Sequence, residues 1–428
     1  MSADQLIVRM YNAGFGDCFL VTIPTAEGPR RILIDCGTHP SSTGPRQARR
    51  DVVPLLMADL QAEAGRLRVD VVVATHRHRD HLSGFEAPEF ADLEVGEVWM
   101  PWTENRDDPV ATALRERMKI TALALDTARL GIERATPAIA AVDELLANTL
   151  AIKNEASMET LWEGFAGHPK REYLFARAEP LETPLLPGVR IHLLGPATDE
   201  ATIRDLEPPK KETFAHVGGP SVAAETPEGT DEAEIRPPFD DEWATPAAEA
   251  RQNKAFTGLR VSGQIVGAIR DLAADELLAA AASITSSING TSLMFVLEFG
   301  GLFLFFPGDA QWGTWKRVLD DPQRRSLLQR CSFYKIGHHG SHNASPRTFV
   351  EQVMAPNTLA VVPVAPVKVW PLIPQVDLVN AIKGRSVTVV QSDMPPAMGE
   401  VPNVTVRGDQ SVDLAFDIPL PVAGQPPS

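Results

Sequence analysis

Three histidines and one aspartate lie close together directly after a short run of β-branched residues, and these are the residue types of a metal site. The run, residues 69–75, predicts a buried strand. His76 and His78 are two positions apart, so their rings point to the same side of an extended chain. Asp80 and His81 follow where the next helix is expected to begin. Imidazole and carboxylate ligands suit zinc, manganese or iron, and only 10 of the 428 residues are histidine, so this spacing favours metal binding over a polar turn.

Two further carboxylates occur at strand ends early in the chain. Asp17 ends a glycine-containing turn between strands expected at residues 6–10 and 18–23. Asp35 ends the strand expected at residues 31–34. A carboxylate there can hold a ligand histidine through its second ring nitrogen, although a simple turn aspartate before glycine has the same sequence. Both interpretations of Asp35 are open at this point.

The second half of the chain also has apolar strands that end in polar residues. Strands are expected at residues 293–298 and 302–306, with Asn289 before the first and Asp309 after the second. The strand expected at residues 332–336 ends in the sequence Gly-His-His-Gly-Ser-His-Asn. These polar groups therefore come from separate strand ends, which is where open α/β sheets place their sites.

The alternation of strands and helices predicts a layered α/β architecture. Residues 105–186 are rich in Ala, Leu, Glu and Arg and predict a helical insertion that walls the site, forms a structural subdomain or makes an oligomer contact. Residues 205–251 are rich in proline and acidic residues and predict a long, partly disordered surface loop. The main domain is then divided into a first half (residues 1–104), a return strand (187–204) and a second half (252–420). A short tail follows at residues 421–428.

Composition excludes some classes of protein. The formal net charge of −16 argues against a broad basic surface for non-specific binding of nucleic acid. It leaves open a nucleic-acid substrate, because bound metal ions bring positive charge to an acidic site. The longest apolar stretch, residues 293–306, is interrupted and too short for a membrane span, and the N-terminus lacks the features of a signal peptide. The 3 cysteines adjoin apolar runs, which predicts buried free thiols and a cytoplasmic protein.

Taken together, these strand-end motifs resemble those of the metallo-β-lactamase fold superfamily of metal-dependent hydrolases. The closer similarity is to the soluble hydrolase domain of the ComEC/Rec2 competence proteins. The resemblance covers roughly residues 6–104, 187–200 and 287–393. Besides the histidine cluster, the motifs that carry it are Gly-Phe-Gly-Asp at 14–17, Asp-Cys-Gly at 35–37, Asn289 with Thr291 and Ser292, Pro-Gly-Asp-Ala at 307–310 and Lys-Ile-Gly-His-His-Gly-Ser at 335–341.

The resemblance implies a four-layer αβ/βα sandwich, here with a helical insertion, and two divalent ions, zinc or manganese, at one edge of the sheets. It implies a set of six metal ligands, which are His76, His78, Asp80, His81, Asp309 and His338. Within this set His76 and His78 would hold the first ion, and Asp309 would bridge the two ions. We favour His338 for the second ion because it directly follows the strand and Gly337, and His339 is the alternative.

The sequence departs from the superfamily pattern at two places. Many members supply a third histidine to the first ion, but the corresponding strand end here reads Gly-Pro-Ala-Thr-Asp and offers only Asp199. ComEC-like domains look similar in lacking this histidine. His192 lies within the preceding strand, so we expect it to be a packed core residue. Where those domains have a His-Pro pair late in the chain, this sequence has Trp370 and Pro371.

Three functions follow as hypotheses. The first is a phosphodiesterase or nuclease that uses a metal-activated water, with Asp80 and Asp309 in catalytic roles. The second is an acyl hydrolase of the same superfamily, acting on a lactam, lactone or thioester. The third is a non-catalytic module that binds a protein partner or a second copy through the insertion. Residues expected to hold a ligand in place or to contact substrate are Asp17, Asp35, Asn289, His339, Ser341 and His342.

Overall fold

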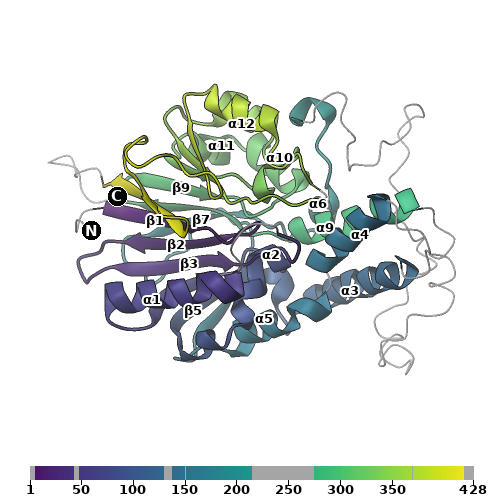
Figure 1. Cartoon of the computed structure of the whole chain (residues 1–428), viewed down its shortest axis with the longest axis horizontal. Coiled ribbons are helices and arrows are strands. Elements are labelled where there is room, and N and C mark those ends of the chain that lie inside the picture. Colours follow the sequence, from purple (N-terminus) through teal and green to yellow (C-terminus); the bar gives the residue numbers. More distant parts are fainter. Residues whose placement is uncertain are drawn as a thin grey trace.

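The computed structural model describes residues 5–42, 48–129, 137–149, 151–214, 274–368 and 370–418. Two β-sheets face each other, and helices cover the outer face of each (Figure 1). The sequence prediction of a four-layer αβ/βα sandwich is therefore confirmed. The predicted tail and most of the acidic loop lie outside the described residues.

The larger sheet has eight strands in the order β13-β14-β1-β2-β3-β4-β5-β6. β3, β4, β5 and β6 run parallel, and the remaining pairs are antiparallel. The strand bounds are Gln5–Tyr11 (β1), Cys18–Ile23 (β2), Arg30–Cys36 (β3), Arg68–Val73 (β4), Glu94–Pro101 (β5), Lys170–Leu174 (β6), Val404–Arg407 (β13) and Ser411–Asp417 (β14). β13 and β14 were not predicted from the sequence, and β6 lies inside the range predicted as a helical insertion.

The smaller sheet has six strands in the order β12-β11-β10-β9-β8-β7. β7, β8 and β9 are antiparallel, whereas β9 to β12 run parallel. Gly300 and Gly301, both at positive φ, make the tight turn between β8 and β9. The strand bounds are Arg190–Gly195 (β7), Met294–Phe299 (β8), Leu302–Phe306 (β9), Phe333–Lys335 (β10), Leu359–Val362 (β11) and Thr388–Gln391 (β12).

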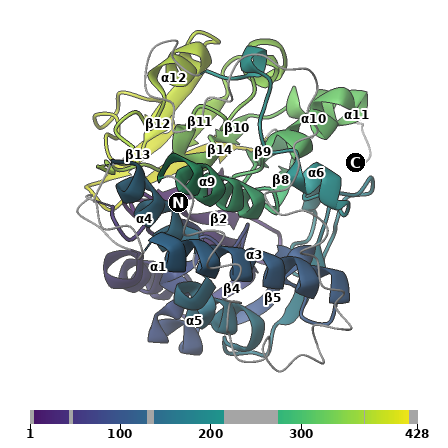
Figure 2. The same cartoon turned by 90° about the vertical axis from the view of Figure 1, so that its right-hand side faces the viewer.

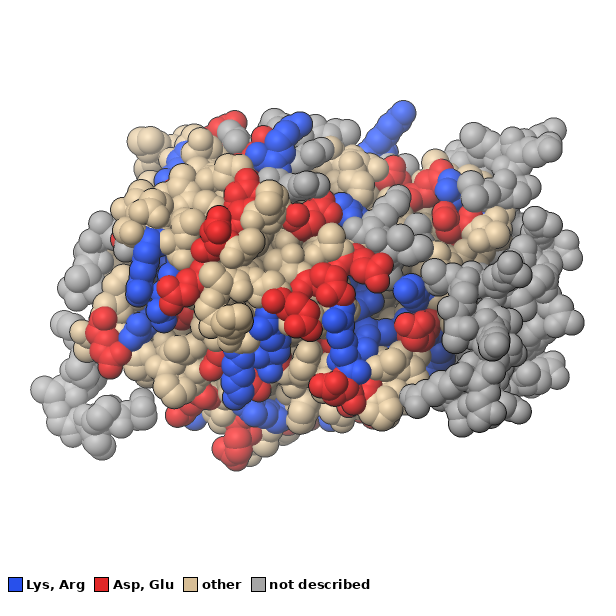
Figure 3. All heavy atoms as spheres, turned by 90° about the horizontal axis from the view of Figure 1, so that it is seen from below, with Lys and Arg blue, Asp and Glu red and all other residues tan. Residues whose placement is uncertain are grey.

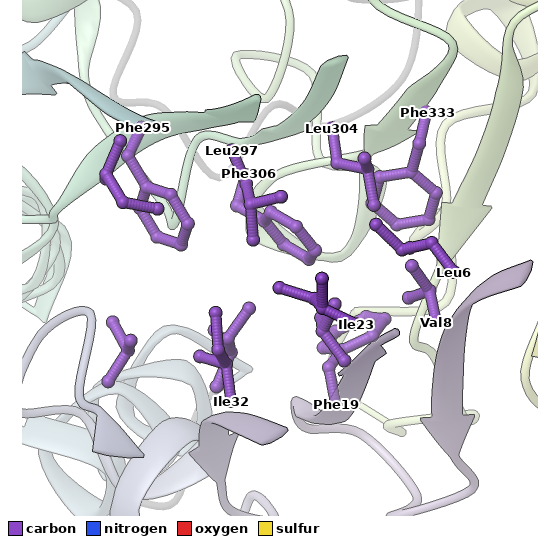
Figure 4. Packing of buried hydrophobic residues seen from close by; sticks show 14 of the residues in the cluster. Leu6, Val8, Phe19, Ile23, Ile32, Phe295, Leu297, Leu304, Phe306 and Phe333 are labelled. Atoms are coloured by element: carbon purple, nitrogen blue, oxygen red, sulfur yellow. The ribbon is translucent and has the colours of Figure 1, made fainter. Parts of the chain in front are cut away.

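The inner faces of the sheets form one apolar core (Figure 4). Because side chains alternate along a strand, β1 presents Leu6 and Val8 to this core and β9 presents Leu304 and Phe306. The Phe295 and Phe306 rings stack with their centroids 5.4 Å apart. This core fixes the two sheets to each other, so polar groups at the end of one sheet are held opposite those of the other.

Helices close both outer faces. α1 (Val53–Ala64) and α5 (Ala151–Glu163) pack on the larger sheet. α10 (Trp312–Asp320), α11 (Pro322–Leu328) and α12 (Val376–Lys383) pack on the smaller sheet. α1 begins with a proline in its first turn and ends at Gly65, whose φ of 67° is left-handed, which are the usual start and stop residues of a helix.

Three more helices form a lobe across one end of the sandwich (Figure 2). They are α3 (Pro109–Arg129), α4 (Pro137–Thr149) and α9 (Ala274–Asn289). Their buried residues, which include Leu125, Val142 and Leu277, form a separate apolar cluster. α9 comes from the second half of the chain, so the lobe is built from two distant segments. No helix among the described residues is long and apolar enough to cross a membrane.

Candidate metal centre

The candidate site lies where strands of both sheets end. β3 and β4 run parallel, as do β9 and β10, so the polar residues that follow each pair lie at the same edge of their sheet. The backbone N–H of Leu293, before β8, donates to the Thr75 carbonyl after β4 at 2.9 Å. This bond joins the two sheets directly beside the cluster. The short helix α2 (Arg79–Leu82) then carries Asp80 and His81.

Two glycines allow the early turns to approach this helix closely. A Cβ atom on Gly37 would collide with the backbone of Asp80 and His81, and one on Gly16 would collide with Gly37. The Asp17 backbone N–H donates to the Asp80 carbonyl at 2.9 Å. The turn that holds Asp17 is therefore fixed against the residues of the histidine cluster.

The first two histidines face each other. His76 Nε2 and His78 Nδ1 lie 3.0 Å apart, as expected for side chains two positions apart in extended chain. Both residues are 1% exposed. His78 Nε2 is buried and has no hydrogen-bond partner among the described residues.

The two ring nitrogens of His81 have different surroundings. Its Nδ1 lies 2.8 Å from Asp35 Oδ2, and Thr75 donates to the same carboxylate from its backbone N–H and its hydroxyl, both at 2.7 Å. His81 Nε2 lies 3.3 Å from Asp309 Oδ2. Asp35 therefore fixes the ring so that Nε2 points toward Asp309, which is the orienting role that one of the two interpretations assigned to it.

Asp309 contacts residues from both halves of the chain. Its Oδ1 accepts from Lys335 Nζ at 3.1 Å and from the His338 backbone N–H at 2.8 Å. Lys335 Nζ also lies 2.6 Å from Asp17 Oδ2. One buried lysine thus joins the two carboxylates, and Asp309 Oδ2 remains directed at His81.

The adjacent histidines of the last motif have different surroundings. His339 Nδ1 lies 2.8 Å from the Pro363 carbonyl, and its Nε2 lies 3.1 Å from Asp80 Oδ2. The His338 ring instead contacts the Ser341 hydroxyl, which lies 2.8 Å from its Nδ1. Both residues have positive φ, 44° and 50°, so the backbone turns sharply here and only one ring is directed at Asp80. This geometry favours His339, the alternative to His338, as the second-ion ligand.

Among the described residues there are three groups in each of which the ligand atoms lie within 4.8 Å of one another. The groups are His76–His78–Asp80, His76–His81–Asp309 and Asp17–His81–His339. The donors suit a divalent metal ion: two imidazoles are fixed through Nδ1 with Nε2 left toward the cluster, and buried Asp17 Oδ1 lacks a hydrogen-bond partner within the described chain. The residues therefore fit a metal centre.

Burial and neighbouring charges shift the pKa values of these histidines in opposite directions. Burial, with His81 nearby, lowers the pKa of His76 well below its usual value, and burial lowers that of His78 to about 4. Burial alone would also lower the pKa of His81, but Asp309 and Asp17 outweigh it and raise that pKa. His76 and His78 are therefore neutral at pH 7, the form in which imidazole binds metal.

Asp80 and Asp309 stay ionised despite their burial. Burial would raise the pKa of Asp309, but Lys335 and His81 outweigh it and hold that pKa well below its ordinary value. Asp80 behaves in the same way because His81 and His339 lie beside it. The centre thus combines the neutral imidazoles of His76 and His78 with the ionised carboxylates of Asp80 and Asp309 and the ammonium of Lys335. Burial would lower the pKa of His81 and His339, but the neighbouring carboxylates outweigh it and raise the pKa of both rings.

Other residues singled out from the sequence lie at varying distances from the centre. Asn289 is fully buried, and neither of its side-chain polar atoms has a hydrogen-bond partner in the described chain. The Ser341 hydroxyl donates to Asn343 at 2.8 Å, and the His342 carbonyl accepts from the Phe214 N–H at 3.3 Å. Asp199 is not brought to the centre, because it caps α6 (Glu200–Arg204) and pairs with Arg317 on the surface.

The first-ion group accordingly contains no third histidine in the described residues, and Asp199 does not replace it. His192 Nε2 lies 2.6 Å from Glu298 on the neighbouring strand, away from the centre. Trp370 packs its ring 5.0 Å from His39, measured between centroids. Trp370, which stands where ComEC-like domains have the His-Pro pair, thus makes an aromatic contact near the site.

Several residues of the site were missed from the sequence. Lys335 was noted only as part of a motif, although a lysine within an otherwise apolar strand was a usable signal. His39 is fully buried, with Nδ1 3.9 Å from Glu144 Oε2 of α4. Asn148, also on α4, accepts from the Asp80 backbone N–H at 3.1 Å and donates to Asp80 Oδ1 at 3.0 Å. Nothing in the sequence pattern indicated which insertion residues face the cluster.

Replacing Asn148 with alanine is expected to weaken metal binding by about 10- to 100-fold, because Asp80 loses the amide that orients it. The buried Asp80 N–H also loses its partner, which costs about 1–3 kcal/mol in the free energy of unfolding. Metal titration and thermal unfolding of Asn148→Ala measure the two effects. Asn380→Ala, an exposed asparagine on α12, is the control. Equal metal affinity in Asn148→Ala and the control would show that α4 only covers the site.

Comparison with known families identifies the first part of the chain. Residues 11–104 match the family model described as "Metallo-beta-lactamase superfamily". The matched range contains β4, α2 and the residues between them, and with these it contains His76, His78, Asp80 and His81. No curated protein matches the chain. Together with the buried ligand groups, the match supports a metal-dependent hydrolase.

Proposed function

We propose that the chain is a metal-dependent phosphodiesterase or nuclease that acts on nucleic acid or a nucleotide. The observation that carries this proposal is the arrangement of ligand groups on both sides of Asp309, with enough donors for two divalent ions. Pairs of divalent ions are typical of enzymes that displace a group at phosphorus. The similarity of the last motif to ComEC/Rec2-like hydrolase domains supports the same substrate class.

The residues that would hold the ions are His76 and His78 for the first, with Asp80, His81 and His339 for the second. Asp309 would contact both. Bound there, divalent zinc or manganese would polarise a phosphoryl oxygen and lower the pKa of water.

The chain itself supplies orientation and charge. Asp35 sets the direction of His81, and Lys335 balances the charges of Asp17 and Asp309. Asp80 is ionised at neutral pH and accepts a proton at Oδ2, but its low pKa makes it a weak base. Its larger contribution is therefore as a ligand.

Metal addition is expected to stabilise the folded protein, because the ligand set exists only in the folded chain. At a free ion concentration about 100-fold above Kd, the stabilisation is about 2.7 kcal/mol. Thermal unfolding of chelator-treated protein, with and without zinc or manganese, measures it. His76→Ala should reduce the shift, and an unchanged shift would contradict the assignment of His76.

A substrate panel tests the reaction. Metal-loaded protein is expected to cleave bis(p-nitrophenyl) phosphate and short DNA or RNA, and chelator treatment should abolish the cleavage. Hydrolysis of a lactam, lactone or thioester without any phosphodiester cleavage would replace the proposal with the acyl hydrolase. If the wild-type protein binds no metal and does not differ from His76→Ala in these assays, the non-catalytic module is favoured instead.

A further inference from the structure

A cavity of about 260 Å³ is lined mainly by residues of α3 and α5. Its lining includes Arg77, which stands between His76 and His78 in the chain. The Arg77 carbonyl accepts from Asn154 Nδ2 of α5 at 2.6 Å, so this part of the cluster is tied to the helix that forms one wall. Arg77 therefore links the cavity wall to the histidine cluster through the chain.

Cationic side chains dominate the polar lining of this cavity. The cationic residues are Arg77, Arg106, Arg115 and Lys119, against the carboxylates Glu116 and Glu155. Over the face in Figure 3, Lys and Arg are interspersed with Asp and Glu. Carboxylates outside the lining pair with two of these cations, Glu104 with Arg77 and both Glu159 and Glu163 with Arg106. The positive charge available in the pocket therefore depends mainly on Arg115 and Lys119.

These cations differ in how fully they are already paired. Arg77 forms a two-point pair with Glu104 and is largely neutralised. The hydrogen bonds of Arg115 go to the Thr103 and Asn105 carbonyls and to a hydroxyl, not to a carboxylate. No carboxylate of the described chain forms an ion pair with Lys119. Arg115 and Lys119 therefore retain most of their positive charge for a ligand.

The side chain of Arg106, which lines the cavity, is already held in place by its neighbours. Its guanidinium lies 3.7 Å from the centroid of the Trp162 ring, and it pairs with Glu159 and, at 3.7 Å, with Glu163, all three side chains being exposed. An exposed pair of this kind contributes about 0–1 kcal/mol, so an incoming anion can replace Glu159. The Trp162 indole N–H is bonded to the Glu104 carbonyl at 3.0 Å, which fixes the ring under Arg106.

A smaller cavity of about 10 Å³ continues from the first. It shares Arg77, Arg115 and Lys119 and extends to Thr149 and Ile288. In the chain Thr149 follows Asn148, which binds Asp80, and Ile288 precedes Asn289, whose side chain has no hydrogen-bond partner in the described residues. The smaller cavity therefore shares its cations with the first one and has two lining residues that are chain neighbours of residues at the metal centre.

We propose that the α3–α5 pocket binds a phosphate group of the substrate next to the bond that is cleaved. The proposal rests on the proposed function and specifies its substrate as one with a second phosphate. Drug-sized ligands occupy pockets of about 300–1,000 Å³, so this cavity suits a phosphate with part of a sugar rather than a whole nucleotide. Guanidinium groups recognise phosphate through paired N–H donors, which Arg106 and Arg115 supply.

The test uses chelator-treated full-length protein, in which no cleavage occurs, and thymidine dinucleotides with a 5′-phosphate, a 3′-phosphate or neither. Isothermal titration calorimetry should show about tenfold tighter binding for one phosphorylated form, as expected for one added charged contact. Lys119→Glu should remove this preference. Arg106→Gln is a second variant, and thermal unfolding checks that each variant is folded.

Lys316→Glu is the matched control, because it reverses one exposed helical lysine on α10 outside the pocket. It should keep the full preference for the phosphorylated form. Equal binding of all three dinucleotides to the wild type, or a preference that survives both pocket variants, would overturn the proposal. The proposed function fails separately if the metal-loaded wild type cleaves no dinucleotide. In that case the binding preference for the phosphorylated form can still persist.

Discussion

Replacing Asp309 with asparagine is expected to lower kcat/KM for a phosphodiester by about 10³-fold or more, equivalent to at least about 4 kcal/mol in the transition state. Asp309 takes part in a ligand group with His76 and His81, and it is the member contributed by the second half of the chain. Asparagine has the same shape but lacks the charge. The metal content of the purified variant should fall together with the rate.

The variant also disturbs the charge balance of the buried centre. Lys335 contacts both Asp17 and Asp309, so it keeps one carboxylate partner when Asp309 is neutralised. The cost in the free energy of unfolding should therefore be smaller than the roughly 3–5 kcal/mol that accompanies complete loss of a buried partner. A folded but inactive protein is the expected result.

Asp199→Asn is the control for Asp309→Asn, because Asp199 was the sequence candidate for the first ion yet lies on the surface. It should retain wild-type metal content and activity. Measurements of metal content and cleavage of bis(p-nitrophenyl) phosphate compare the two. If Asp309→Asn keeps both while Asp199→Asn loses them, the arrangement of ligands proposed for this centre is wrong.

Both the layered fold and the location of the site could be predicted from the sequence, because both follow from where the apolar strands end. Parallel apolar strands end at a common sheet edge, so the polar residues that follow the strands before His76 and Asp309 lie close together when the two sheets stack. The spacing of His76 and His78 predicted that their rings face each other, because side chains repeat every two residues in extended chain.

Other features depend on contacts that the local pattern does not contain. The orientations of His338 and His339 follow from two successive residues at positive φ, which a His-His pair does not signal. The contact of Asn148 with Asp80 depends on how α4 packs against α9, more than one hundred residues later in the chain. β14 pairs with β1 from the opposite end of the chain, so its strand pattern gave no indication of its partner.

Replacing Lys335 with methionine is expected to destabilise the metal-free protein by about 3–5 kcal/mol, which lowers Tm by several degrees. Lys335 is 1% exposed, and its ammonium lies 2.6 Å from Asp17 Oδ2 and 3.1 Å from Asp309 Oδ1. Burial alone would lower the lysine pKa, but these two carboxylates raise it, so the group is charged. Methionine has a similar length and leaves both buried carboxylates without this cation.

Metal should reverse much of this loss, because a divalent ion beside Asp309 supplies positive charge where the ammonium was removed. The rise in Tm on adding zinc or manganese should therefore be larger for Lys335→Met than for the wild type. Lys316→Met, on the exposed face of α10, should show the wild-type rise. An equal rise in all three proteins would mean that Lys335 and the metal ions do not share the charge of Asp309, and that the lysine serves the fold alone.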